Sequence, residues 1–128
     1  EEVLRFCLRQ QYEKQFQRFA DQEVITVGEI VGAFAVVVAE NQNLLRLMIE
    51  NQLESVLADE ITQCVALFAG KFVRKEQQRE QLPYSEALLS GSLGYLLVYW
   101  FRQERPISIE QLTQLISEFL NGKLFELM

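Results

Sequence analysis

The chain has 128 residues, 49% of them hydrophobic and 23% charged, as expected of an ordinary globular domain. This length predicts one domain, residues 1–128, with enough chain to bury a core. A net charge of −6 argues against direct contact with a nucleic-acid backbone, which needs lysine and arginine beside a polyanion. The sequence has no histidine and no long uninterrupted apolar run, so we expect no metal, no cofactor and no membrane span. The two cysteines lie far apart in the chain and predict reduced core thiols in a cytoplasmic protein.

The first predicted helix starts near the N-terminus and ends near Asp21, after about five turns. Its apolar stripe advances by steps of four and three residues and consists of Leu4, Leu8, Tyr12, Phe16 and Phe19. A second helix is predicted from Thr26 to about Ala39, because Thr26 and Glu29 form a capping-box pattern. Residues 30–39 are apolar and rich in valine, so a β-strand is the alternative there; the cap favours the helix.

Two further helices are expected in the middle of the chain. Asn43 is a candidate cap for a short helix over residues 44–51. A long helix follows over residues 53–81, and its buried stripe is Leu57, Ile61, Cys64, Val65, Phe68 and Phe72. Basic residues gather late in this helix at Lys71, Arg74, Lys75 and Arg79. Because Glu76 and Glu80 alternate with them, we interpret this segment as a solvated helix face and not as a phosphate-binding surface.

The helix from Tyr84 to Phe101 is apolar on every side over its second half, which predicts burial all round. One arc of this helix carries the small residues Ala87, Ser90, Gly91 and Gly94. Val98 and Phe101 extend this arc toward the C-terminus. Opposite them stand Leu89, Leu93, Leu96 and Trp100. Since glycine weakens a helix by about 1 kcal/mol, the small arc favours close docking of another helix, while the bulky side fills the core.

The last predicted helix begins at Ser108, which forms a second capping box with Gln111, and ends before Gly122, a candidate left-handed cap. Its apolar stripe is Ile109, Leu112, Leu115, Ile116, Phe119 and Leu120. Arg105-Pro106 separates it from the preceding helix, so the two should form a helical hairpin. Six helices and no convincing strand predict an all-α, bundle-like antiparallel fold.

No pattern of nucleophile and base is present, so an enzyme is not expected. Several aromatic residues fall on the predicted inward stripes, and such faces either form a filled core or leave an apolar cavity for a small ligand. If a cavity exists, the candidate ligand-binding residues are Tyr12, Phe16, Phe34, Val38, Ile61, Cys64, Phe68, Tyr95 and Trp100.

Residues 87–121 resemble the C-terminal regulatory domain of tetracycline-repressor-type (TetR-family) transcription regulators. The resemblance consists of a helix with Gly91 and Gly94, then Tyr99-Trp100-Phe101, a charged turn with Pro106, and a capped amphipathic helix. It implies a homodimer in which the last two helices form a four-helix interface with those of a second copy. The residues implied at that interface are Ala87, Gly91, Gly94, Val98, Phe101, Leu112, Leu115, Ile116 and Phe119.

The resemblance further implies a small effector held among the core helices, and DNA binding only through a helix-turn-helix domain that precedes residue 1 and is not in this chain. The effector would release the protein from DNA by moving the first helix. The alternative, from another class, is a stand-alone helical adaptor or carrier that binds a lipid or a protein. The first hypothesis predicts roughly 50–60 further residues upstream in the gene, basic and helix-turn-helix in pattern, and the second predicts a natural start at or near residue 1.

Overall fold

The computed structural model describes residues 2–69 and 80–124, and in those ranges it contains six α-helices and no strand. The helices are α1 (Glu2–Gln17), α2 (Val27–Glu40), α3 (Gln42–Glu50), α4 (Glu54–Ala69), α5 (Leu82–Arg102) and α6 (Ile109–Leu120). The all-α prediction is therefore confirmed. The predicted continuation of the long helix past Gly70, with its basic cluster, lies outside the described residues.

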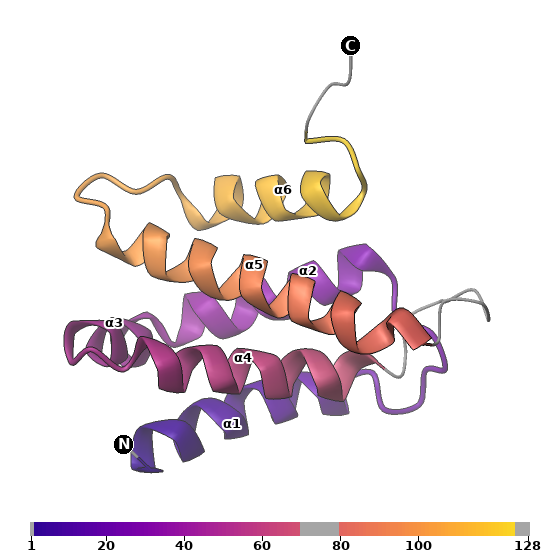
Figure 1. Cartoon of the computed structure of the whole chain (residues 1–128), viewed down its shortest axis with the longest axis horizontal. Coiled ribbons are helices and arrows are strands. Elements are labelled where there is room, and N and C mark those ends of the chain that lie inside the picture. Colours follow the sequence, from indigo (N-terminus) through magenta and orange to yellow (C-terminus); the bar gives the residue numbers. More distant parts are fainter. Residues whose placement is uncertain (1, 70–79, 125–128) are drawn as a thin grey trace.

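Figure 1 shows α1, α4, α5 and α6 following one another across the molecule, with α2 behind them and α3 at one end. α4 packs against both α1 and α5, whereas α2 packs against α1 and α6. The least exposed side chains of the core are Leu45, Met48 and Leu57, at 0–1% of their free surface. They come from α3 and α4, so the short α3 closes one end of the core and does not lie on the surface.

The predicted caps at Thr26, Ser108 and Gly122 are present, whereas the predicted cap at Asn43 is not, because that residue lies inside α3. The Thr26 hydroxyl accepts a hydrogen bond from the Glu29 amide at 3.1 Å, and the Glu29 carboxylate accepts one from the Thr26 amide at 3.1 Å. Ser108 and Gln111 make the same reciprocal pair at 3.0 Å. Gly122 has a φ of +72°, the left-handed conformation that favours glycine after a helix. The helix over residues 27–40 excludes the strand alternative.

Two predicted helix ends were wrong. α1 ends at Gln17, and the backbone tightens into turns in which the Arg18 and Phe19 amides bond to carbonyls three residues back. The short helix begins at Gln42 and not after Asn43. The side chain of Asn41 donates to the Val37 carbonyl at 2.8 Å, so the chain turns from α2 into α3 within one residue.

No single helix in the two described ranges is long and apolar enough to cross a membrane, although the pair α2 and α3, bent by 73°, passes that test together.

The predicted orientation of α5 was wrong by about a quarter turn. Its buried residues are Ser90, Leu93, Gly94, Leu97 and Trp100, which take some members from each of the two predicted faces. A Cβ at Gly94 would lie 3.7 Å from Ile61 Cδ1, so this glycine admits α4 of the same chain. Periodicity could not choose the inward side, because apolar residues surround this helix.

The hairpin prediction was also wrong in its packing. α5 and α6 run in opposite directions in Figure 1, but no Cα of one lies within 8 Å of a Cα of the other over their described lengths. α6 packs on α2 instead, and its buried residues Leu112 and Ile116 share a core cluster with Val31 and Val38. The backbones of α5 and α6 are therefore widely separated, and the buried face of α6 is covered by α2.

Candidate functional site

A cavity of about 70 Å³ lies between α1, α2, α4 and α5. Its wall is almost entirely carbon and is formed by Leu8, Tyr12, Gln15, Ile30, Ala33, Phe34, Val37, Val38, Leu45, Leu57, Glu60, Ile61, Cys64, Val65, Phe68, Leu89, Leu93 and Leu97. α2 supplies residues spaced by three and four positions, so one side of that helix faces the cavity. No Cα of α2 comes within 8 Å of α4 or α5 over the described lengths of the three helices, and side chains alone bridge this space.

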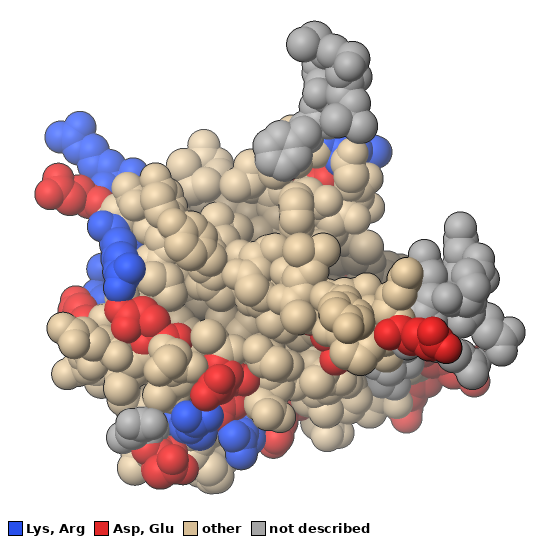
Figure 2. All heavy atoms as spheres, in the orientation of Figure 1, with Lys and Arg blue, Asp and Glu red and all other residues tan. Residues whose placement is uncertain are grey.

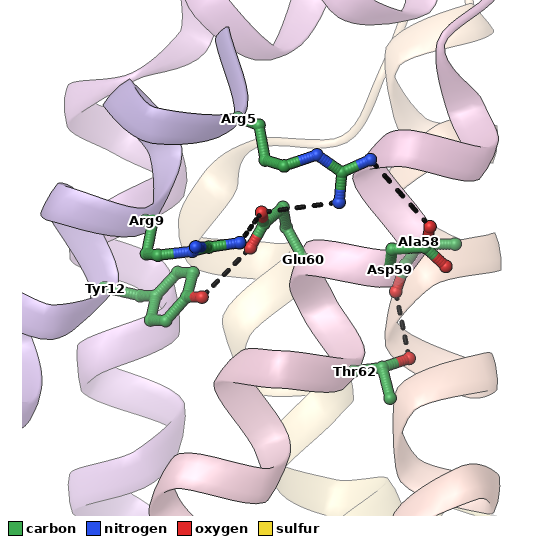
Figure 3. Close-up of polar contacts among 7 residues, drawn as sticks. All are labelled: Arg5, Arg9, Tyr12, Ala58, Asp59, Glu60 and Thr62. Carbon is green, nitrogen blue, oxygen red and sulfur yellow. Dashed lines mark hydrogen bonds and ion pairs between the residues drawn. The ribbon is translucent and has the colours of Figure 1, made fainter. Parts of the chain in front are cut away.

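A polar cluster beside the cavity joins α1 to α4 (Figure 3). The Glu60 side chain is fully buried, yet it carries a carboxylate. Its Oε1 accepts a hydrogen bond from Arg9 Nη2 at 2.7 Å, and its Oε2 accepts one from the Tyr12 hydroxyl at 3.0 Å. Arg5 Nη1 lies 3.6 Å from the same Oε1, and the other Arg5 nitrogen, Nη2, lies 3.9 Å from Asp59.

These contacts offset the free-energy cost of burying the charged Glu60 carboxylate. A carboxylate taken out of water is costly unless it is both paired and hydrogen-bonded. Glu60 meets two guanidinium groups and a phenol, all from α1, so its stability requires α1 to stay in register with α4. Burial, and then the bond to Glu60, raise the pKa of Tyr12 far above its ordinary value. The bond to Glu60 likewise raises the pKa of Arg9.

Two other polar side chains reach the cavity wall. Burial raises the pKa of the Cys64 thiol to about 12, with the nearby Glu60 charge adding to the effect. Cys64 is therefore a protonated, inert lining residue. Gln15 is 6% exposed, and its Oε1 accepts a hydrogen bond from Arg18 Nη1 at 2.9 Å. Nothing in the described part of the chain offers an acceptor to its Nε2.

Six of the nine predicted ligand-binding residues line the cavity: Tyr12, Phe34, Val38, Ile61, Cys64 and Phe68. Phe16 stands behind the wall, with its ring edge-on to that of Phe68 at 5.2 Å. Trp100 is buried away from the cavity, and its indole donates to the Ile107 carbonyl at 2.7 Å. Tyr95 was predicted to point inward, but it is 76% exposed, because α5 is rotated.

Sequence reasoning missed both buried polar residues of this site. Glu60 directly precedes Ile61 of the predicted apolar stripe of α4, but it was not included in that stripe. Gln15 lies three residues after Tyr12 and four before Phe19, so its helical position alone indicates the inward side. A polar residue inside an apolar stripe is the signal that could have identified it.

The outer face of α5 and α6 is the second candidate surface. Four large side chains fall on one line along α5, with exposed fractions of 54–78%: Tyr84, Leu88, Tyr95 and Tyr99. We call them the α5 outer stripe. Figure 2 shows that most of the surface over α5 and α6 is uncharged, while charged side chains gather at its margins. α5 itself contains only two charged residues, Glu86 and Arg102.

The structure divides the predicted interface residues between this face and the core. Gly94, Leu112 and Ile116 are buried within their own chain, so the prediction that they meet a second copy needs correction. Ala87, Gly91 and Phe119 are exposed, and Val98, Phe101 and Leu115 are half-buried. A shallow groove between α4 and α5 passes over Ala58, Gly91 and Val98 and ends at an ion pair of Glu54 with Arg102.

Comparison with protein-family models, curated proteins and solved structures found no match to this chain. Within residues 2–69 and 80–124, no group of three or more cysteine or acidic side chains is placed to hold a metal ion. The geometry defines an all-α domain with a small, mostly apolar cavity among its helices and a largely uncharged outer face on α5 and α6.

Proposed function

We propose that this chain is the effector-binding and dimerisation domain of a TetR-type transcription regulator, which controls a helix-turn-helix domain preceding residue 1. The observation that carries the proposal is the α5 outer stripe on a largely uncharged face. Single exposed apolar residues are common on monomers, but four large side chains aligned on one largely uncharged face indicate an interaction surface. A second copy of the chain suits this face best, because a largely uncharged face needs no complementary charge on its partner and can pack against itself.

An isologous dimer brings α5 against α5 of the partner, with α6 alongside. Gly91 lies on the edge of the α5 outer stripe, and a Cβ there would meet no atom within 4 Å. This opening beside Tyr95 gives the partner's aromatic ring a place to dock. The interface then consists of Leu88, Gly91, Tyr95 and Tyr99, flanked by Phe119 of α6.

The cavity supplies the second half of the proposal. α1 carries one wall of the cavity and, by the resemblance, leads to the DNA-binding domain. A ligand that fits the cavity better in one position of α1 shifts the equilibrium between two arrangements of the DNA-binding heads. Glu60 couples the two events, because it touches the cavity and holds α1 through Arg9 and Tyr12.

Sedimentation equilibrium tests the proposal directly. The chain should be a dimer at micromolar concentration, and Leu88→Glu or Tyr95→Glu should convert it to a monomer with an unchanged helical circular dichroism spectrum. Gln10→Glu, which places the same charge on the exposed side of α1, is the matched control and should remain dimeric. A wild-type chain that stays monomeric at the highest concentration would remove the basis of the proposal.

The alternative is a stand-alone adaptor or carrier. A lipid would not fit the cavity of about 70 Å³, since ligand pockets usually measure about 300–1,000 Å³, but the open groove between α4 and α5 measures about 770 Å³ and is large enough for one. A protein adaptor would use the α5 outer stripe for a different chain. A monomer in sedimentation would favour that function.

A further inference from the structure

We infer that the cavity between α1, α2, α4 and α5 admits short hydrocarbons of about three heavy atoms and rejects molecules of the same shape that carry a hydrogen-bonding atom. The inference rests on the cavity proposed above as the effector site and names the chemical class of its ligand. Three properties of the cavity support it: the carbon surface of its wall, its volume and the side chains that close it.

The wall presents almost only carbon to the cavity, although Tyr12, Gln15 and Glu60 belong to it. Both oxygens of the Glu60 carboxylate are bonded to α1, one to Arg9 and the other to the hydroxyl of Tyr12. The Oε1 atom of Gln15 accepts a hydrogen bond from Arg18. A ligand with a hydroxyl, ether or carbonyl oxygen would therefore give up its hydrogen bonds to water and meet carbon in exchange.

The same wall disfavours water and ions. A water molecule inside a protein needs about two to four polar partners. An ionised ligand would lose its hydration, and the charge of Glu60 is already balanced by Arg9 and Arg5. A hydrocarbon gives up no hydrogen bonds and gains dispersion contacts with the carbon atoms of the wall.

The volume of the cavity sets the size of the ligand. The cavity measures about 70 Å³, roughly half of an engineered apolar cavity of about 150 Å³ that accepts benzene. Half of a six-carbon ring corresponds to about three heavy atoms, which is the size of propane or propene.

Side chains, and not helix backbones, close the cavity between α2 and α5. No Cα of α2 lies within 8 Å of a Cα of α5 over their described lengths. Phe34 and Val37 of α2 and Leu89 of α5 line the cavity and are half-buried, so they also contact solvent. Exposed side chains change rotamer within nanoseconds, so a small ligand can enter here without displacing a helix.

The test compares propane with dimethyl ether, which has an ether oxygen in place of the central CH2 and keeps the shape. Each gas is dissolved at known concentrations with the full chain, and the methyl signals of Leu57, Ile61 and Leu97 at the cavity wall are followed in ¹H–¹³C NMR spectra. We expect propane to shift these signals to saturation. Dimethyl ether should bind at least fivefold more weakly, because its oxygen loses a hydrogen bond to water.

Three variants locate the bound gas. Ala33→Leu fills the cavity from α2 and should abolish propane binding. Val65→Ile adds one carbon from α4 and should weaken propane binding at least threefold, so the test remains decisive if the larger change prevents folding. Ala58→Leu makes the same change as Ala33→Leu, but in the groove between α4 and α5, and should leave propane binding unchanged.

The inference is overturned if dimethyl ether binds as tightly as propane, if neither Ala33→Leu nor Val65→Ile weakens propane binding, if Ala58→Leu abolishes it, or if propane does not bind. Dimerisation is measured separately by sedimentation. A dimer that does not bind propane overturns this inference alone, and a monomer that binds propane in the cavity overturns the regulator proposal alone.

Discussion

The Tyr12→Phe substitution isolates the hydrogen bond that joins α1 to the buried carboxylate of α4. Phenylalanine keeps the ring, which is 5% exposed, so the packing of Tyr12 is preserved. What disappears is a 3.0 Å bond to Glu60, whose side chain has no access to water. Hydrogen bonds to charged groups contribute about 1.5–3 kcal/mol, so we expect the free energy of unfolding to fall by about 2 kcal/mol. A chain of this size should then lose roughly 6–10 °C in melting temperature.

Urea unfolding followed by far-ultraviolet circular dichroism measures this loss, with all proteins at the same concentration because dimerisation shifts apparent stability. Tyr84→Phe is the matched control, since Tyr84 is 78% exposed, and it should change stability by less than about 0.5 kcal/mol. In a Glu60→Leu background the hydroxyl has no acceptor, so Tyr12→Phe should no longer destabilise. An equal loss with and without Glu60, or a Tyr12→Phe protein as stable as wild type, would refute the assigned role of this bond.

Two further predictions concern titratable groups. The pKa of Glu29 is lowered by the hydrogen bond from the Thr26 backbone, then by those from the Gln22 and Thr26 side chains. The ionised carboxylate therefore stabilises the folded state at pH values above its ordinary pKa near 4.5. This stabilisation is lost as the pH falls through the lower pKa of the folded state. The stability difference between wild type and Glu29→Gln, measured by urea unfolding from pH 7 to pH 3, should therefore shrink on acidification; a pH-independent difference would contradict this. Because the pKa of Cys64 is about 12, only about one thiol in ten thousand is ionised at pH 8, so peptide mass spectrometry should find its alkylation by iodoacetamide far slower in the folded chain than in urea. Equal rates in the two states would mean that Cys64 is accessible and ordinary in its acidity.

Features that depend on a few neighbouring residues could be predicted from the sequence. Thr26 caps α2 through a residue three positions away, and Ser108 caps α6 in the same manner. Gly122 can take the left-handed conformation because it has no Cβ, which in other residues would clash with the backbone. Residues spaced by three and four positions correctly grouped six members of the cavity wall, from Tyr12 to Phe68.

Which side of α5 faces the core could be established only from the tertiary structure. α5 is apolar all round, so its period is equally consistent with Tyr95 or Leu97 in the core; contact with α4 decides for Leu97, which is 2% exposed, against Tyr95.

Six helices, the caps of α2 and α6 and the apolar faces available for packing could be predicted from local sequence, because these features follow from interactions within one or two helical turns. The burial of Glu60 could not be predicted in this way, since its partners Arg9 and Tyr12 lie 51 and 48 residues away in the chain and come together only in the folded protein. The same is true of Gln15, which is enclosed among the residues that line the cavity, because α2, α4 and α5 must be assembled around α1 before that lining exists.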